Sequence, residues 1–162
     1  MYTISKRYTF EAAHHINTLP EGHKCKRPHG HSYTAEFKVM CNVLNRHGFV
    51  MDFGEMDIAI KPIIDQLDHH DLNEVFDNVP MTSEFLAGWL FFEVDHRING
   101  GSGIIYDPSD DPDLMRFDQF TADTAAYVAH IRAAVQKPRY ATPRLMSVRV
   151  SETDKTYAEY TR

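Results

Sequence analysis

The sequence is short of several features that would place it in a specialised class of protein. It has two cysteines, Cys25 and Cys41, in 162 residues, and a chain of this length can bury a core without disulfides. No apolar run approaches the roughly 20 residues of a membrane-spanning helix. The first residues also lack the basic-then-apolar pattern of a signal peptide. We therefore expect a cytoplasmic protein with free thiols and no membrane partner.

Basic residues are also scarce. The chain has 17 Lys and Arg against 23 Asp and Glu, which gives a net charge of −6 with histidine neutral. Nucleic-acid-binding domains usually have a basic face, so we expect no nucleic-acid partner. A small anionic substrate is still compatible with this charge where basic groups cluster locally. The length and the apolar content of 43% predict one globular domain, residues 1–162.

Alternation of apolar and polar residues predicts four strands. It runs through residues 4–14 and 29–41, and again through residues 146–152 and 155–160. The polar segment 17–28 contains two prolines and a glycine, so it is predicted to be a loop. If the first two strands pair around this loop, they form a hairpin.

Helical periodicity occupies the middle of the chain. Asp52 is a candidate N-cap with Glu55 in position for a capping box, and apolar residues follow at helical spacing. A second helix is predicted to begin near Thr82 or Ser83, and a third to span residues 121–137. The order of elements predicts an α+β fold, with an antiparallel sheet and helices on one of its faces.

Histidine is the residue type in excess, with ten copies. His29 and His31 are two residues apart on a predicted strand, so their rings project from the same face. His14 ends the other strand of the hairpin on its apolar face, whereas His15 points to the opposite face. Three converging imidazoles leave a position open on a divalent ion, which is typical of catalytic zinc. Imidazole also suits other first-row metals, and the alternative is a set of unrelated strand-end histidines.

Cys25 precedes these histidines in a basic segment. Lys24, Lys26 and Arg27 surround it, and positive charge favours the thiolate form of cysteine. A base or nucleophile near the metal is therefore one interpretation of Cys25, and an ordinary loop cysteine is the other. Cys41 ends an apolar strand face and is predicted to be buried and inert.

Two further acidic positions are candidates for the site. Asp68 precedes His69, and a carboxylate beside an imidazole can orient the ring and stabilise its charged form. The alternative for this pair is a polar helix terminus. Glu152 lies on an apolar strand face with Met146, Val148 and Val150, where a carboxylate needs a partner. It serves either a structural ion pair or a ligand that presents hydrogen-bond donors, such as the edge of a pterin.

Seven segments of the chain resemble, in order, those of the family of 6-pyruvoyltetrahydropterin and 6-carboxytetrahydropterin synthases. They are residues 10–14 (FEAAH), 21–25 (EGHKC), 29–33 (HGHSY), 51–53 (MDF), 67–73 (LDHHDLN), 82–84 (TSE) and 151–153 (SET). The combination of C-x3-H-G-H with the preceding A-A-H and the later L-D-H-x-x-L-N is highly specific.

The resemblance implies a tunnelling fold, in which each subunit contributes a four-stranded antiparallel sheet with two helices on one face. Subunits of this family assemble into a barrel, commonly a homo-hexamer. The segment of about residues 98–144 exceeds the compact bacterial pattern and is expected to be an inserted helical segment. Met81 stands where the family often has proline.

The resemblance also implies roles for individual residues. His14, His29 and His31 would hold Zn²⁺, Cys25 would abstract a proton, and Asp68 with His69 would form the second acid–base element. Glu152 would anchor the pterin ring, with Thr82 as a further substrate-binding residue. Lys24 and Arg27 are candidates to contact a triphosphate.

The implied reaction is that of a lyase acting on 7,8-dihydroneopterin triphosphate. The segments around Cys25 and His31 are more similar to bacterial 6-carboxytetrahydropterin synthases, whose product feeds 7-deazaguanine (queuosine) synthesis. The alternatives are a 6-pyruvoyltetrahydropterin synthase, an aldolase-like enzyme that cleaves the dihydroneopterin side chain, and a non-catalytic module that binds a pterin or a metal.

Overall fold

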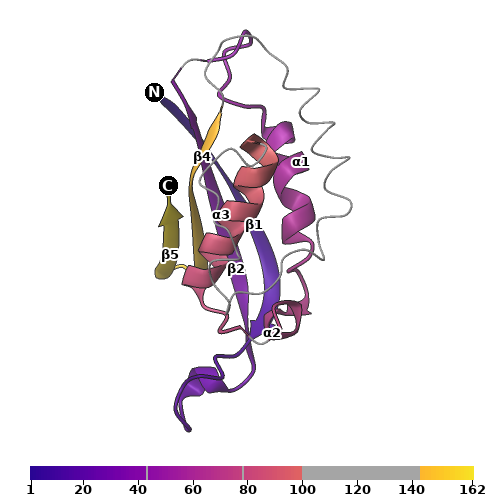
Figure 1. Ribbon diagram of the computed structural model, residues 1–162, viewed down its shortest axis with the longest axis vertical. Coiled ribbons are helices and arrows are strands. Elements are labelled where there is room, and N and C mark those ends of the chain that lie inside the picture. Colours follow the sequence, from indigo (N-terminus) through magenta and orange to yellow (C-terminus); the bar gives the residue numbers. More distant parts are fainter. Residues whose placement is uncertain (43, 78, 100–142) are drawn as a thin grey trace, which may run out of the picture.

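The computed structural model describes residues 1–42, 44–77, 79–99 and 143–162 (Figure 1). The predicted helix at 121–137 and most of the segment 98–144 lie outside these residues. The elements follow in this order along the chain: β1 (Tyr2–His14), the 3₁₀ turn η1 (Lys24–Lys26), β2 (His29–Cys41), α1 (Phe53–Ile64), β3 (His70–Asp71), α2 (Leu72–Val75), α3 (Ser83–Asn99), β4 (Arg144–Thr153) and β5 (Thr156–Thr161).

The strands form one mixed sheet in the order β3-β1-β2-β4-β5. The four predicted strands are all present and antiparallel to their neighbours, and β1 and β2 form the expected hairpin. The prediction of four strands is corrected to five, because β3 pairs in parallel with the end of β1. A strand of two residues is too short to show any periodicity in the sequence.

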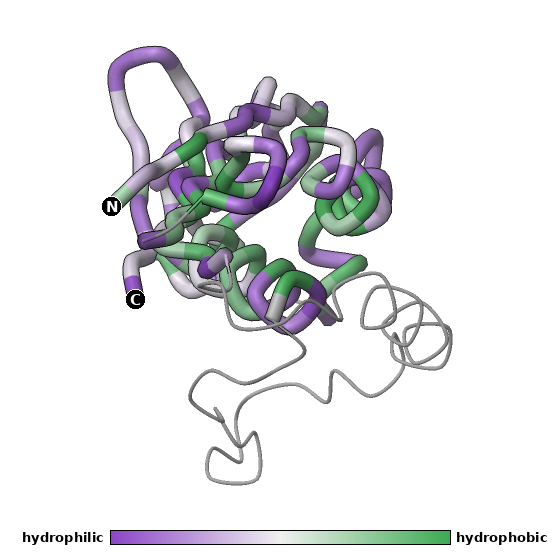
Figure 2. The backbone as a smooth tube through the Cα atoms, turned by 90° about the horizontal axis from the view of Figure 1, so that it is seen from above, coloured by the Kyte–Doolittle hydropathy of each residue, from purple (hydrophilic) through white to green (hydrophobic). Residues whose placement is uncertain are grey.

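The helices cover one face of the sheet, and the core lies between them (Figure 1). α1 packs on β1, and α3 packs on β4 and β5. The strands supply alternate side chains to this core, among them Phe10, Tyr33 and Phe37, each at most 2% exposed. Hydrophobic and hydrophilic positions are interspersed along the described elements in Figure 2, as expected for elements with one buried face. No helix in the described ranges is long and apolar enough to cross a membrane.

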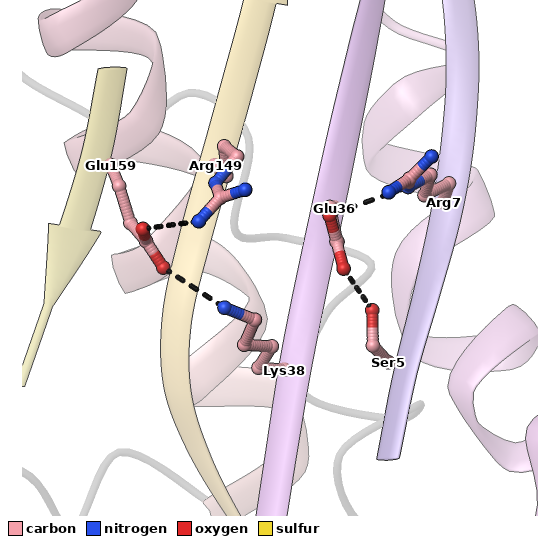
Figure 3. Close-up of polar contacts among 6 residues, drawn as sticks. All are labelled: Ser5, Arg7, Glu36, Lys38, Arg149 and Glu159. Carbon is pink, nitrogen blue, oxygen red and sulfur yellow. Dashed lines mark hydrogen bonds and ion pairs between the residues drawn. The ribbon is translucent and has the colours of Figure 1, made fainter. Parts of the chain in front are cut away.

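The opposite face of the sheet, which we call the outer face, has paired polar side chains (Figure 3). Ser5 and Arg7 of β1 both contact Glu36 of β2. On the other side of β2, Glu159 of β5 accepts from Arg149 Nη2 at 2.9 Å and from a lysine, Lys38. Opposite charges thus satisfy one another between β1 and β2, between β4 and β5, and, for Lys38 and Glu159, across β4.

Local signals set the boundaries of the helices. The side chain of Asp52 accepts from the amide of Gly54, and the side chain of Glu55 accepts from the amide of Asp52, so the predicted capping box is confirmed. α3 begins at Ser83, one of the two predicted start positions.

A β-bulge changes the predicted face of one residue in β4. The pairing of β2 with β4 shifts between Lys38 and Val39, so Val39 lies opposite Leu145 and Lys38 opposite Ser147. Leu145 is therefore fully buried in the core, and Met146, predicted to share a face with Glu152, is not in the core. Beyond the bulge, Val148 and Val150 keep the predicted alternation.

Candidate metal centre and acid–base groups

Three histidine rings meet at the end of the β1–β2 hairpin. The strand register places His14 opposite His29, and His31 lies two residues further along β2 on the same face. The ring centroids are 4.5 to 5.0 Å apart, and one nitrogen from each ring lies within 4.8 Å of the other two. The convergence expected from the strand pattern is therefore present, and three imidazole ligands could hold a metal ion here.

Backbone carbonyls determine which nitrogen of each ring is available. His14 Nδ1 lies 2.6 Å from the carbonyl oxygen of Met81, and His29 Nδ1 lies 2.8 Å from that of Arg27. A carbonyl oxygen only accepts, so both Nδ1 atoms carry a proton. In the neutral rings, Nε2 of both residues then presents a lone pair, which is how outer partners orient metal-binding histidines.

The two Nε2 lone pairs lie close together. His14 Nε2 and His29 Nε2 are 3.1 Å apart, yet two neutral acceptors cannot hydrogen-bond to each other. Tetrahedral zinc with nitrogen ligands at 2.0–2.1 Å separates those ligands by about 3.3 Å. The observed spacing is close to that value, so a bound cation would remove the repulsion between the two nitrogens.

The third ring fits the same interpretation. His31 Nε2 is buried and has no hydrogen-bond partner among the described residues; the carboxylate of Glu152 lies 3.9 Å away. Burial lowers the pKa of His14, which is 2% exposed, and its neighbours His29 and His31 lower it further against the opposing effect of the Met81 carbonyl. A lowered pKa favours the neutral ring that a metal requires.

Glu152 and the start of α3 form one wall of this site. Ser83 Oγ donates to Glu152 Oε1 at 2.6 Å and so fixes the carboxylate beside His31. Thr82, a predicted substrate-binding residue, lies next to Ser83, and its hydroxyl accepts from the amide of Phe85 at 3.3 Å. The hydroxyl of Thr82 thus caps the helix, as is typical of this position.

Cys25 lies in the loop that protrudes beyond the β1–β2 hairpin (Figure 1). Its thiol is free and half-buried, and its carbonyl accepts from the amide of Ile16 at 2.8 Å, close to the end of β1. Lys26 pairs with Glu21, whereas the neighbouring predicted phosphate contacts, Lys24 and Arg27, have no ion pair within the described residues. The loop is therefore anchored at its base beside the histidines.

Asp68 and His69 form a pair at the other edge of β1. Asp68 Oδ2 lies 2.9 Å from His69 Nδ1, while Asp68 Oδ1 accepts from the amide of Glu11 at 2.8 Å. These contacts, the Glu11 amide first, hold the pKa of Asp68 below its usual value, so the carboxylate stays ionised beside the imidazole. The side chain of His69 is 76% exposed, and no hydrogen bond or ion pair among the described residues joins this pair to Cys25.

The backbone at His69 is unusual. Its φ of 61° lies in the left-handed region, which a non-glycine residue adopts rarely. The amide of His69 donates to the carbonyl of Glu11 at 2.6 Å, and the amide of Glu11 donates to the side chain of Asp68. These two hydrogen bonds to Glu11 of β1 maintain the conformation of His69. Such conformations are found preferentially at functional sites.

Comparison with known proteins tests the resemblance. The family model described as 6-pyruvoyl tetrahydropterin synthase matches residues 3–109. The chain belongs to the 6-pyruvoyl tetrahydropterin synthase family. Membership of this family, with the synthases among its relatives, indicates a lyase-type enzyme.

Three relatives match this chain over different fractions of their own length. A 6-carboxy-5,6,7,8-tetrahydropterin synthase of Synechocystis is 37% identical over 100 residues, which are 59% of this chain and 76% of that protein. An enzyme of the same name from Aquifex aeolicus is 34% identical over 51% of this chain and 58% of its own length. A dihydroneopterin monophosphate aldolase of Pyrococcus furiosus is 29% identical over 60% of this chain and 78% of its own.

A solved structure supports the fold. The 6-pyruvoyl tetrahydropterin synthase of Caenorhabditis elegans superposes with a TM-score of 0.64 over 99% of this chain and 95% of that one, at 21% identity. The α+β tunnelling fold predicted from the sequence is thus confirmed for the subunit. β4 and β5, with Glu152, lie beyond the range of the family match but within the structural one.

Sequence reasoning did not identify several residues of the site. The carbonyls of Met81 and Arg27 leave no trace in a sequence, because every residue has a carbonyl. Ser83 and Asn73 lie within the matched segments 82–84 and 67–73, but only their neighbours were assigned roles. A polar residue at the start of a helix beside an expected ligand is the signal that could have identified Ser83.

Proposed function

We propose that this protein is a zinc-dependent lyase that converts 7,8-dihydroneopterin triphosphate and water to 6-carboxy-5,6,7,8-tetrahydropterin, acetaldehyde and triphosphate. The observation that carries the proposal is the 3.1 Å approach of two Nε2 atoms whose Nδ1 protons are held by carbonyls. Two adjacent Nε2 lone pairs beside a third buried imidazole support a bound metal cation at this position. The product would feed 7-deazaguanine (queuosine) synthesis.

His14, His29 and His31 would hold the zinc ion. Zinc would supply Lewis acidity toward the hydroxyls of the substrate side chain and leave at least one coordination position for them. The ring of His14 keeps its orientation through Met81, and that of His29 through Arg27, so the ligands need no rearrangement to bind. Three neutral ligands would leave the positive charge of such an ion uncompensated by the protein.

Cys25 and His69 would move the protons. The thiolate of Cys25 would take a proton from a carbon of the substrate side chain and become the thiol, and His69, oriented by Asp68, would exchange a proton with an oxygen. Asp68 is suited to this positioning because it stays ionised and is itself fixed by the Glu11 amide.

The two proton-moving groups lie in different parts of one chain. Cys25 lies in the hairpin loop, while His69 lies on the exposed outer edge of β1. We place them in a single active site across the interface of a homo-oligomer, a homo-hexamer that closes the sheets into a barrel. β5 ends the strand order on the other side of the sheet, and a strand with one edge unpaired within its own sheet supports such pairing between copies.

Glu152 would anchor the pterin. Its Oε1 is oriented by Ser83, and each carboxylate oxygen can accept more than one hydrogen bond, so the edge of a pterin can still bind. Thr82 would line the same wall of the site. Lys24 and Arg27 would meet the triphosphate from the hairpin loop, where Lys26 is already paired with Glu21.

Product identification tests this function. Zinc-loaded protein is incubated with 7,8-dihydroneopterin triphosphate, and the pterins and aldehydes formed are identified by mass. 6-Carboxytetrahydropterin with acetaldehyde is the expected result. A 6-pyruvoyltetrahydropterin product would contradict it in favour of triphosphate elimination without carbon loss. The aldolase alternative is favoured by the Pyrococcus relative, and it predicts cleavage of the side chain without a 6-carboxy product.

Two sets of variants test the assigned residues. Cys25→Ala should abolish product formation while Cys41→Ala, in the core, retains it; a Cys25→Ala protein that behaves like the parent would support a non-catalytic binding module. Cys25→Ala and His69→Ala, each inactive alone, should recover activity when co-expressed, because mixed oligomers contain some sites with both groups intact. Absence of recovery contradicts a shared site.

A further inference from the structure

Asn73 is a buried polar residue that takes no part in the proposed reaction. It is 1% exposed and follows the two-residue strand β3. Its Oδ1 accepts from the amide of His15 at 2.7 Å, and its Nδ2 donates to the carbonyl of His15 at 2.9 Å. Its own amide donates to the side chain of Asp71 at 2.9 Å, which fixes the start of α2 and with it the position of Asn73.

The side chain of Asn73 acts as one more residue of β3. A carboxamide presents an acceptor and a donor side by side, as a peptide group does. β3 pairs with β1 at Ala12 and Ala13 and then ends. Beyond that point, the side-chain carboxamide of Asn73 bonds both the N–H and the carbonyl of His15. Hydrogen bonding along this edge of β1 therefore continues past Asp71, the last residue of β3.

His14 lies between the two residues held in this way. Ala13 on one side is paired with Asp71, and His15 on the other side is paired with Asn73. The ring of His14 must approach His29 to 3.1 Å while its Nδ1 donates to Met81, and both contacts depend on where the backbone places its Cβ. Strand ends fray unless they are tied down.

We infer that Asn73 is a positioning residue of the metal centre: through the backbone of His15, it holds the backbone of His14 where that ring can share an ion with His29 and His31. This inference rests on the proposed metal site. The same short segment also holds Asp68 and His69 against Glu11, so one length of chain positions both the metal ligand and the acid–base pair.

Zinc affinity tests the inference independently of catalysis. Affinity is measured by competition with a chromogenic chelator for the parent and for Asn73→Ala, and the cobalt-substituted proteins are compared by their d–d absorption. Loss of an outer partner of a metal site typically weakens metal binding 10- to 100-fold. We expect a loss of that size in Asn73→Ala, together with a changed cobalt spectrum.

A matched control separates positioning from stability. Asn45 also makes two side-chain hydrogen bonds to backbone, accepting from the amides of His47 at 2.9 Å and Phe49 at 3.0 Å. Its turn lies at the other end of β1, where Phe49 and Tyr2 line the same hollow. Asn45→Ala should therefore lower thermal stability and leave zinc affinity and the cobalt spectrum unchanged.

The outcomes distinguish this inference from the proposed function. An Asn73→Ala protein with parental zinc affinity and spectrum overturns the positioning role and leaves the metal site intact. If the parent and His29→Ala bind zinc with the same affinity, the proposed metal site itself is overturned. If Asn73→Ala does not fold, Asn73→Asp replaces it, because this variant keeps the shape and the acceptor for His15 but loses the donor. Parental zinc affinity in Asn73→Asp overturns the inference equally.

Discussion

Zinc should stabilise this protein measurably if the three histidines bind it, and mass action gives the size of the effect. The Nε2 atoms of His14 and His29 lie 3.1 Å apart. A ligand that binds the folded chain alone adds about 2.7 kcal/mol to the free energy of unfolding at a concentration 100 times its Kd. One kcal/mol shifts Tm by roughly 2–4 °C in a chain of this size. We therefore expect Tm to rise by about 5–10 °C when zinc is added to chelator-treated protein.

The assay is thermal unfolding with and without zinc in the parent, His29→Ala and His47→Ala. Removal of the His29 ring leaves two ligands, so most of the rise in Tm should disappear. His47 is an exposed histidine in a turn, and its loss should leave the rise intact. An equal rise in the parent and in His29→Ala would refute the assignment of the three histidines as the metal centre.

The same shift should depend on pH in a defined direction. Burial lowers the pKa of His14, so its folded-state pKa lies below the value of about 6.5 of an unfolded chain. The stability that the neutral ring contributes is therefore present above pH 6.5 and is lost as the pH falls through the folded-state pKa. Protons also compete with zinc for the rings, so the rise in Tm should shrink below about pH 6.5. A rise in Tm that is constant down to pH 5 would contradict this account.

Three further predictions follow. Cys25→Ala should bind zinc as tightly as the parent but form product at least about 100-fold more slowly, as measured by product mass; an equally large loss of zinc affinity would contradict a proton-transfer role. The Ser147 hydroxyl and Arg149 lower the pKa of Glu159 to about 2. The ionised carboxylate therefore stabilises the folded state by at most about 3 kcal/mol above pH 4.5, and this contribution is lost between pH 4.5 and 2. Urea unfolding of the parent and Glu159→Gln should therefore differ at pH 7 and converge toward pH 2. Asp52→Ala removes the N-cap of α1 and should cost about 1 kcal/mol, seen as a lower urea midpoint with an unchanged m-value.

The cluster of three histidines could be predicted from the sequence because its geometry follows from strand periodicity. His29 and His31 share a face because they are two residues apart, and the antiparallel pairing of β1 with β2 places His14 opposite His29. The capping box at Asp52 was predictable for a similar reason, since both of its partners lie within one turn. In each case the relevant residues are fixed relative to one another by a single regular element or a single hairpin.

The strap formed by residues 68–73 could not be predicted in the same way. β3 has two residues, and its position depends on hydrogen bonds to β1, more than 50 residues earlier. The left-handed backbone of His69 and the strand-like side chain of Asn73 are consequences of that docking. The bulge that removes Met146 from the core face is equally non-local, because the register between β2 and β4 determines it.

The hydrogen bond from His14 to Met81 uses the backbone of residue 81, where the resemblance to the family leads to an expectation of proline. Met81 stands where proline is frequent, and proline differs from other residues in lacking an amide donor. The structure uses the carbonyl of this residue, which proline and methionine both provide, to hold the Nδ1 proton of His14. Exchange of one residue for the other therefore keeps the tautomer that leaves Nε2 free. The orientation of the His14 ring thus depends on the path of the backbone before α3.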